Sequence, residues 1–333
     1  MVKDYDVIGL GNTIIDLLVE IEEHKLLEMN LKKGEFHLVD KQKSKELLEK
    51  IHTSRWNIKT VPGGSSANTI RGIAMLGGKV ILYGKVGKDK HGEIYVQEME
   101  EQGVDLRIIH QNSSATGNAI TFITPDAERT FSVHLGAAIN LGKEDILEED
   151  IKRGKILHIE GYLIEGPTRE TVLHAINLAK KHNTLVSIDL ADPGVIRRNK
   201  VFLQDLTLHA DIIFANEMEV KEFTGYEEEK AAIELGKTIG KNKIVIVKLG
   251  KRGSLICVNE VITKIDPFPA NVIDTTGAGD CYAAGFLYAF CQGWPLEKAG
   301  ELGSLFAAKI VEKTGVFLQN LDPDSLKKDI LKL

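Results

Sequence analysis

Asp274-Thr275-Thr276-Gly277-Ala278-Gly279-Asp280 is the most informative stretch of this chain, and the small, apolar run 281–287 follows it directly. Glycines at the start of a helix let a phosphate approach backbone N–H groups that have no intrahelical partner, and the helix dipole attracts the anion. We therefore expect Gly277, Ala278 and Gly279 to hold a phosphoryl group. Asp280 is placed to accept the proton of the alcohol that attacks this group. The layout is typical of a small-molecule kinase, and the alternative is an aspartate that only caps a helix.

Two other phosphate-binding signatures are absent from the sequence. It contains no G-x-x-x-x-G-K-[ST] string and no H-R-D string, which argues against a P-loop enzyme and against a protein kinase. The complete string D-T-T-G-A-G-D is more specific than a short motif. It resembles the signature of the ribokinase-like, or PfkB, family of carbohydrate and nucleoside kinases. This resemblance implies a phosphotransferase that uses ATP and acts on an alcohol group.

Length and composition limit the class of protein. With 333 residues and 43% hydrophobic content, the chain can bury a large core as one α/β domain or two smaller ones. Its 42 basic and 48 acidic residues give a net charge of −6, and no stretch concentrates the basic residues that a nucleic-acid surface needs. No run approaches the roughly 20 apolar residues of a membrane span, so we expect a soluble, cytoplasmic protein without a membrane partner. Three isolated cysteines are too few for a disulfide framework or a zinc site.

Short β-branched runs alternate with amphipathic stretches along most of the chain. The expected strands are 7–9, 80–83, 156–159, 185–188, 211–214 and 244–247, with helices such as 167–182 and 227–240 between them. This alternation predicts the α/β class, with a mainly parallel central sheet flanked by helices. Segments of about 12–40 and 105–136 are richer in strand-like alternation and suit a small separate sheet. We expect one kinase domain over 1–333, and the resemblance implies that the small sheet is a lid over the acceptor site.

The end of the first expected strand carries two polar candidates. The sequence Gly9-Leu10-Gly11-Asn12-Thr13-Ile14 lacks the third glycine of a dinucleotide fingerprint, because position 14 is Ile. Asn12 and Asp16 suit a different task, since an amide and a carboxylate together can bind vicinal hydroxyls of a sugar. Asp16 as a solvated turn residue is the alternative.

A second glycine pair opens the helix that runs to about Leu76. Gly63 and Gly64 let a ligand hydroxyl approach backbone amides at the helix N-terminus, and Asn68 lies one turn further on. A structural turn capped by Ser65 is the alternative. Together with the string at 274–280, this segment resembles the second signature of the same family.

The resemblance also implies a nucleotide site. Asn216 and Glu219 match the family's N-x-x-E motif, which organises Mg²⁺ and phosphate, usually through water; capping of a helix by Asn216 is the alternative. The turn that contains Lys248, Gly250 and Gly253 resembles the family's nucleotide-binding turn, although threonine or serine is common in relatives where this chain has Lys248. The resemblance places Thr275, Gly277 and Gly279 on the nucleotide as well.

Residues 11–34 and 160–163 resemble the adenosine-kinase branch of the family. By this resemblance, the sugar of a nucleoside contacts Asn12, Asp16, Gly64 and Asn68, and its 5′-hydroxyl faces Asp280. The base pocket is lined by Leu38, Leu135 and Tyr162, and Arg129 approaches phosphate from the lid. The expected acceptor is a nucleoside, most of all adenosine. A ribose, fructose or related sugar kinase is the first alternative, and a non-catalytic binding protein on the same fold is the second. A requirement for K⁺ and the choice between monomer and homodimer stay open.

Overall fold

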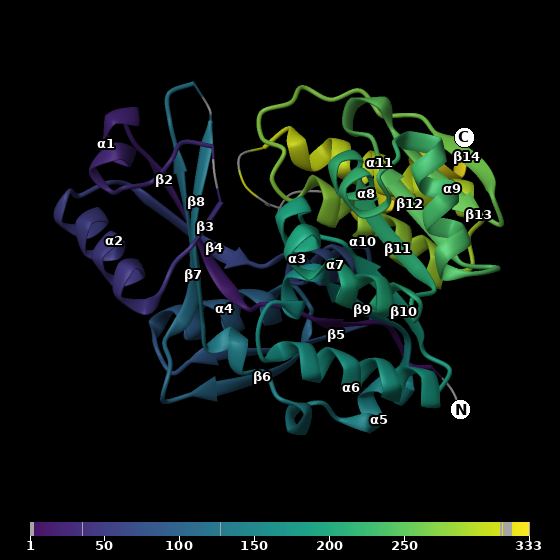
Figure 1. The fold of residues 1–333 in the computed structure, drawn as a ribbon, viewed down its shortest axis with the longest axis horizontal. Coiled ribbons are helices and arrows are strands. Elements are labelled where there is room, and N and C mark those ends of the chain that lie inside the picture. Colours follow the sequence, from purple (N-terminus) through teal and green to yellow (C-terminus); the bar gives the residue numbers. More distant parts are fainter. Residues whose placement is uncertain (1–2, 35, 127, 314, 316–321, 333) are drawn as a thin grey trace.

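The computed structural model describes residues 3–34, 36–126, 128–313, 315 and 322–332. Within these residues the chain forms a sheet of nine strands and a sheet of five (Figure 1). The strands of the large sheet, in spatial order, are β14 (Val261–Ile265), β13 (Ser254–Val258), β12 (Ile244–Lys248), β11 (Ile212–Asn216), β10 (Leu185–Asp189), β9 (Gly154–Glu160), β1 (Tyr5–Leu10), β5 (Val80–Gly87) and β6 (Asp105–Gln111). The strands from β12 to β6 are parallel, and β13 and β14 are antiparallel to their neighbours.

The central strands of the large sheet, such as β1, β5, β9 and β12, are buried on both faces and consist mainly of apolar residues. Successive side chains point to opposite faces. In β12, for example, Ile244 and Ile246 belong to one hydrophobic core, and Val245 and Val247 belong to the other. Both faces must therefore be covered by helices.

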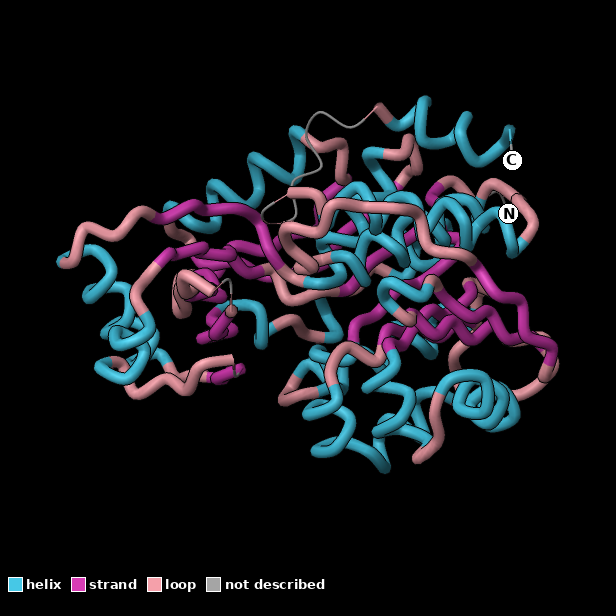
Figure 2. Tube along the Cα trace, turned by 90° about the horizontal axis from the view of Figure 1, so that it is seen from above, coloured by secondary structure: helices cyan, strands magenta, loops and turns pink. Residues whose placement is uncertain are grey.

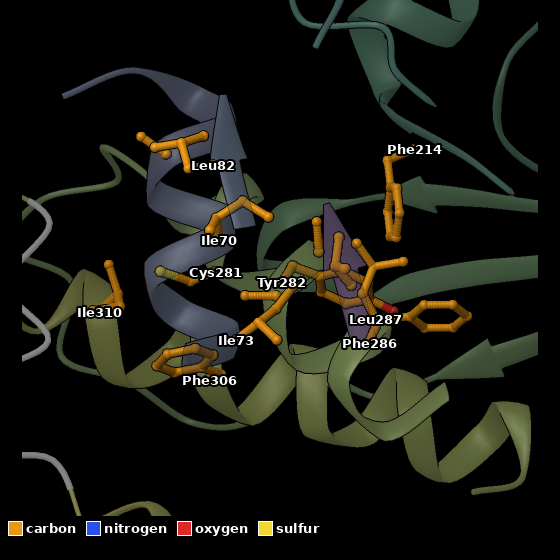
Figure 3. Close-up of a cluster of buried hydrophobic side chains, with 14 of the residues drawn as sticks. Ile70, Ile73, Leu82, Phe214, Cys281, Tyr282, Phe286, Leu287, Phe306 and Ile310 are labelled. Carbon is orange, nitrogen blue, oxygen red and sulfur yellow. The ribbon is translucent and has the colours of Figure 1, made fainter. Parts of the chain in front are cut away.

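The helices are α1 (Glu23–Glu28), α2 (Lys41–Thr53), α3 (Ser65–Met75), α4 (Lys90–Glu101), α5 (Glu148–Arg153), α6 (Thr168–Lys181), α7 (Pro193–Thr207), α8 (Glu217–Thr224), α9 (Glu228–Ile239), α10 (Ala278–Cys291), α11 (Leu296–Val311) and α12 (Pro323–Lys332). Helices α3, α10 and α11 cover one face, and α5 to α9 cover the other. Figure 3 shows the first core, where Phe214 of β11 meets Phe286 of α10 edge-on with ring centroids 5.6 Å apart. This contact packs α10 against the strands of the large sheet.

The small sheet consists of β3 (Phe36–Leu38), β8 (Arg129–Gly136), β7 (Thr116–Ile123), β2 (Ile14–Glu20) and β4 (Ile58–Gly63), in that spatial order. Helices α1 and α2 lie on one side of it, and the body built on the large sheet lies on the other (Figure 1). Figure 2 shows these strands at one end of the molecule. On β2, Ile15, Leu17 and Val19 pack into the core with α1 and α2. Alternation therefore turns Ile14 and Asp16 toward the body.

The predicted α/β class and the six expected strands of the large sheet are confirmed, but the expected extent of the small sheet was partly wrong. Residues 105–111 form β6 of the large sheet, because β5, α4 and β6 make a parallel crossover unit. The small sheet instead takes β4, which lies outside both expected segments. Residues 35 and 127, within those segments, lie outside the described residues.

In the part of the chain that the structure describes, no helix has both the length and the apolar character needed to cross a membrane.

Candidate active site

Four neighbouring parallel strands end in polar residues at one edge of the large sheet. Glu160 ends β9, Asp189 ends β10, Asn216 ends β11 and Lys248 ends β12. Glu160 is the register partner of Asp189, and Asn216 is that of Lys248. Ligands of open α/β sheets bind at the carboxyl ends of the strands. The site is therefore expected at this edge.

Helix α10 brings the 274–280 string to this edge. Gly277, in the left-handed conformation, precedes the helix, and Asp280 lies in the first turn. Two side chains of α3 donate to the Asp280 carboxylate: Ser65 Oγ to Oδ1 at 2.7 Å and Asn68 Nδ2 to Oδ2 at 2.8 Å. Thr69 Oγ1 also donates to the Asp280 carbonyl at 3.2 Å. The two signature segments, more than 200 residues apart in sequence, thus meet at one carboxylate.

The environment of Asp280 favours a role as base. Burial is the largest influence and raises the pKa of its carboxyl, while the hydrogen bonds from Asn68 and Ser65 lower it; the net shift is upward. A higher pKa makes the carboxylate a stronger proton acceptor. The two hydrogen bonds also fix its orientation, as a general base requires.

Asp16 lies beside the glycine pair that opens α3. A methyl group on Gly63 would lie only 2.2 Å from Asp16 Oδ1, and one on Gly64 would lie 2.1 Å from the Asn12 carbonyl oxygen. Gly64 also has φ = 97°, which side chains rarely allow. The predicted residues Asn12, Asp16, Gly63 and Gly64 are thus in close contact, and they need both glycines.

The Asp16 residue is half-buried, and its carboxylate interacts electrostatically with the guanidinium of Arg71. Burial raises the pKa of Asp16 to about 7, Arg71 lowers it and Asp280 raises it further. Asp16 and Asp280 are therefore close enough to interact electrostatically.

The Asn68 side chain makes two hydrogen bonds within the protein that the sequence did not indicate. Its Oδ1 accepts a hydrogen bond of 2.6 Å from Arg71 Nη2, and its amide nitrogen donates to Asp280. Asn68 thus helps to orient the Asp280 carboxylate. A contact of Asn68 with the acceptor stays a prediction.

An apolar row continues from Asp16 across the small sheet. Asp16 is the register partner of Ala119, Ala119 that of Val133, and Val133 that of Leu38. Partners in register share a face, so this row faces the body together with Asp16. Of the expected base-pocket residues, Leu38 lies at the end of the row, and Leu135 lies two residues along the strand from Val133. Tyr162 lies on the body, half-buried, and its hydroxyl donates to the Ala191 carbonyl at 3.4 Å.

Glu160 connects Asn12 to the start of α3. Its Oε1 accepts a hydrogen bond of 2.9 Å from the Asn12 N–H, and its Oε2 accepts one of 2.7 Å from the Ser66 N–H. Burial raises the pKa of this carboxyl to about 7, although the two N–H groups lower it. In the sequence, Glu160 is part of a segment that resembles the adenosine-kinase branch, and no role is predicted for it. Its position as a charged residue at the end of a buried strand is the signal that indicates a role at the site.

Asn216 and Glu219 form a capping box at the start of α8. Asn216 Oδ1 accepts from the Glu219 N–H at 2.9 Å, and the Glu219 carboxylate accepts from the backbone N–H of Asn216 at 2.7 Å and from its side-chain amide at 2.5 Å. The helix-capping alternative is therefore present in the structure. Burial, followed by the Asp189 carboxylate, raises the pKa of Glu219. No group of three or more potential metal ligands occurs in the described ranges, and a role of this pair toward Mg²⁺ stays a prediction.

Lys248 lies closer to α10 than its position in sequence suggests. Its ammonium donates to Asp189 Oδ2 at 2.8 Å, and a methyl group on Gly279 would lie 3.1 Å from its Nζ. Gly250 and Gly253 belong to the following turn, where the Leu249 N–H donates to the Gly253 carbonyl at 2.8 Å. Thr275 is exposed in the loop before α10. Contacts of Gly250, Gly253 and Thr275 with a nucleotide stay predictions.

Arg129 joins the small sheet to the loop before α10. Its Nη2 lies 2.5 Å from Asp274 Oδ2, and its guanidinium also contacts Thr276 Oγ1. Burial opposes ionisation of Asp274, but Arg129 and the N–H groups of Gly315 and Thr276 hold its pKa below the usual value. Arg129 therefore contacts the loop before the proposed phosphoryl cradle, where it is paired with a carboxylate, and its approach to phosphate stays a prediction.

Comparisons with known proteins agree with this geometry. The model of the pfkB family of carbohydrate kinases matches residues 35–322. A 5-dehydro-2-deoxygluconokinase of Clostridium perfringens is 33% identical over 267 residues, which cover 75% of this chain and 78% of the relative.

Two solved structures resemble almost the whole chain, each at 29% identity. One is a probable sugar kinase from Rhizobium etli, with a TM-score of 0.89 over 99% of this chain and 98% of that one. The other is the adenosine kinase from Sinorhizobium meliloti, with a TM-score of 0.88 over 99% of both chains. The protein is a phosphotransferase with an alcohol acceptor, and the chain belongs to the PfkB family of carbohydrate kinases.

Proposed function

We propose that this kinase transfers the γ-phosphoryl group of ATP to the 5′-hydroxyl of a nucleoside, with adenosine as the preferred acceptor. The observation that carries the proposal is the row Asp16, Ala119, Val133 and Leu38 on the body-facing side of the small sheet. It has the Asp16 carboxylate at one end and apolar side chains beyond it. Three strand spacings of about 4.8 Å give the row a length of about 14 Å. A ribose at Asp16 and a purine over the apolar residues would fill such a surface.

The charges around the acceptor space also favour a neutral acceptor. Arg129 is paired with Asp274, and Lys248 is paired with Asp189. Arg71 donates to Asn68 and interacts with the Asp16 carboxylate. An acidic sugar would have to take Arg129 or Arg71 from its present partner, or share the Lys248 ammonium with the transferring phosphoryl group. A neutral nucleoside would leave these ion pairs intact.

In the proposed reaction, Asp280 accepts the proton of the acceptor hydroxyl while that oxygen attacks the γ-phosphorus. The new P–O bond forms as the bond to the β-phosphate oxygen breaks, and ADP leaves. Gly277 and Gly279 present N–H groups, and α10 presents the positive end of its dipole, to the transferring group. Asp280 and these glycines are intact, which argues against a non-catalytic protein on the same fold.

The site suits Mg²⁺ held through water. Both oxygens of Glu219 already accept hydrogen bonds from Asn216, so Glu219 is better placed to bind a hydrated ion than to ligate a bare one. When bound, Mg²⁺ neutralises charge on the ATP phosphates. A requirement for K⁺ stays a prediction, to be tested by exchanging potassium for sodium salts in the same assay.

A sugar kinase is the second candidate, and the relatives support it. The Clostridium perfringens relative is named for a sugar acid, and the Rhizobium etli neighbour is described as a probable sugar kinase. Under this hypothesis, a carboxylate or further hydroxyls of the acceptor would bind where we place the purine.

The test compares kcat/KM for adenosine, guanosine, cytidine, ribose and fructose with ATP and Mg²⁺, following ADP release. We expect adenosine to be the best acceptor. Higher values for ribose or fructose than for every nucleoside would overturn the nucleoside proposal and leave the kinase assignment intact.

A variant at the far end of the row makes the test specific to the base. Leu38 is 57% exposed, so Leu38→Asn should fold normally. Loss of an apolar contact of about 1–2 kcal/mol should lower kcat/KM for adenosine about 5- to 30-fold and leave ribose unaffected. Leu147→Asn, at a residue 52% exposed in the loop before α5, is the matched control. Equal losses for adenosine and ribose would remove Leu38 from the base site.

A further inference from the structure

A buried ion pair joins the ends of two strands that are not neighbours. Lys248 ends β12, Asp189 ends β10, and β11 lies between them. The Lys248 ammonium is 2.8 Å from Asp189 Oδ2, and the two side chains are only 14% and 7% exposed. A buried pair of this kind needs an explanation, because burying both charges is costly.

The position of the Lys248 ammonium indicates that it can attract an anion at the start of α10. A methyl group on Gly279 would lie 3.1 Å from Lys248 Nζ, so the ammonium lies beside the first turn of α10. Two positive features, the ammonium and the N-terminal end of the helix dipole, therefore face the same small space. Asp189 is the carboxylate bonded to the ammonium there. An anion that enters this space would be attracted by both features.

The ammonium also has donors to spare. A lysine ammonium has three N–H donors, and among the described residues its hydrogen bond is the one to Asp189. Burial alone would lower the pKa of Lys248, but the carboxylates of Asp189 and Glu219 outweigh it and raise the pKa above its ordinary value. The group therefore stays charged at neutral pH.

Other carboxylates compete for this cation. Lys248 interacts electrostatically with Glu219 and with the expected base Asp280. A lysine side chain is long and flexible. Without Asp189, the ammonium could turn to Asp280 and neutralise the group that must accept a proton.

We propose that Lys248 and Asp189 act as a charged pair in phosphoryl transfer, in which Asp189 positions the Lys248 ammonium beside Gly279 so that it binds the transferring phosphoryl group. Lys248 is then a catalytic residue, and Asp189 is a positioning residue that acts through it. The Asp189–Lys248 bond is retained throughout the reaction, and no proton leaves the ammonium. The proposal holds for a nucleoside or a sugar acceptor, so its test is independent of the acceptor assignment.

The test uses Lys248→Met, Asp189→Asn and the double variant, assayed with the best acceptor found for the parent enzyme. The double variant removes both charges together and so leaves neither partner of the pair as an unpaired buried charge. We expect its kcat to fall about 100- to 1,000-fold, the usual effect of removing one donor from a developing anion. The KM for the acceptor should stay within threefold of the parent value. A double variant with kcat within threefold of the parent would overturn the proposal.

The single variants test whether Asp189 acts through Lys248. Asp189→Asn alone should lower kcat at least tenfold, and adding it to Lys248→Met should cause no further loss. Losses that multiply would show that Asp189 acts independently and would overturn its positioning role. The matched control is the buried pair Lys85 and Asp145, whose charged atoms lie 2.5 Å apart with side chains 7% and 9% exposed. Lys85→Met with Asp145→Asn should change the melting temperature but leave kcat within threefold.

Discussion

Gly63→Ala should disable acceptor binding by moving one carboxylate. The added methyl group would lie 2.2 Å from Asp16 Oδ1, 2.3 Å from its Cγ and 2.6 Å from its Oδ2. Ordinary contacts begin near 3.4 Å, so Oδ1 must move by about 1.2 Å, which is 3.4 minus 2.2. The backbone cannot easily yield, because Gly63 and Asp16 lie on the paired strands β4 and β2. The side chain of Asp16 must therefore rotate out of its place.

The size of the effect follows from the hydrogen bonds that Asp16 is expected to make. A hydrogen bond to a charged group contributes about 1.5–3 kcal/mol. Its loss corresponds to a decrease of about 10- to 150-fold in kcat/KM for the acceptor. The KM for ATP should change little, since the cradle at 277–279 is formed by a different segment.

Steady-state kinetics with varied acceptor and varied ATP measure both effects. Gly236→Ala is the control, because its methyl group would meet only Cys257 Sγ, at 3.5 Å. In an Asp16→Ala background the carboxylate is already gone, so Gly63→Ala should add little. A folded Gly63→Ala enzyme with the parent's kcat/KM would refute the reasoning, as would an equal further loss in the Asp16→Ala background.

Four further predictions concern the transfer step and the binding of ATP and Mg²⁺. Asp280→Asn should lower kcat about 10²- to 10⁴-fold with little change in the melting temperature or the KM for ATP, and near-normal turnover would remove Asp280 as the base. Because the pKa of Asp280 is raised above the ordinary 3.8 and the base must be ionised, kcat/KM should fall as pH falls through a value above 3.8; a profile flat down to pH 4 would contradict this. Glu219→Gln should raise the Mg²⁺ concentration for half-maximal rate, and unchanged Mg²⁺ dependence would restrict Glu219 to capping α8. Arg129→Met should raise the KM for ATP at least threefold if Arg129 exchanges Asp274 for phosphate, and an unchanged KM would restrict Arg129 to its ion pair.

Most of the fold was predictable from local patterns in the sequence. Runs such as Ile244–Lys248 are β-branched and bounded by turn residues, so strand and period were apparent from the sequence. Alternation alone could not assign Asp105–Gln111 to a sheet, since that depends on the partner strand and not on the strand itself. The crossover connection through α4 places this strand beside β5, in the large sheet.

The sequence also marked the two ends of the site, but not how they are joined. The glycine pairs and Asp280 were apparent because backbone approach to a ligand leaves a local signature. Ser65, Glu160 and Asp189 were missed as site residues, since their partners lie 215, 148 and 59 residues away. Only the folded chain brings such contacts together.

Direct competition between two acceptors tests the central claim, that the acceptor is adenosine. Equal concentrations of adenosine and 5-dehydro-2-deoxygluconate are given to the parent enzyme with limiting ATP and Mg²⁺, and the two phosphorylated products are quantified by mass spectrometry. The product ratio equals the ratio of the two kcat/KM values. The row from Asp16 to Leu38 and the pairing of Arg129 with Asp274 predict at least tenfold more AMP than phosphorylated sugar acid. An excess of the phosphorylated sugar acid would contradict the account.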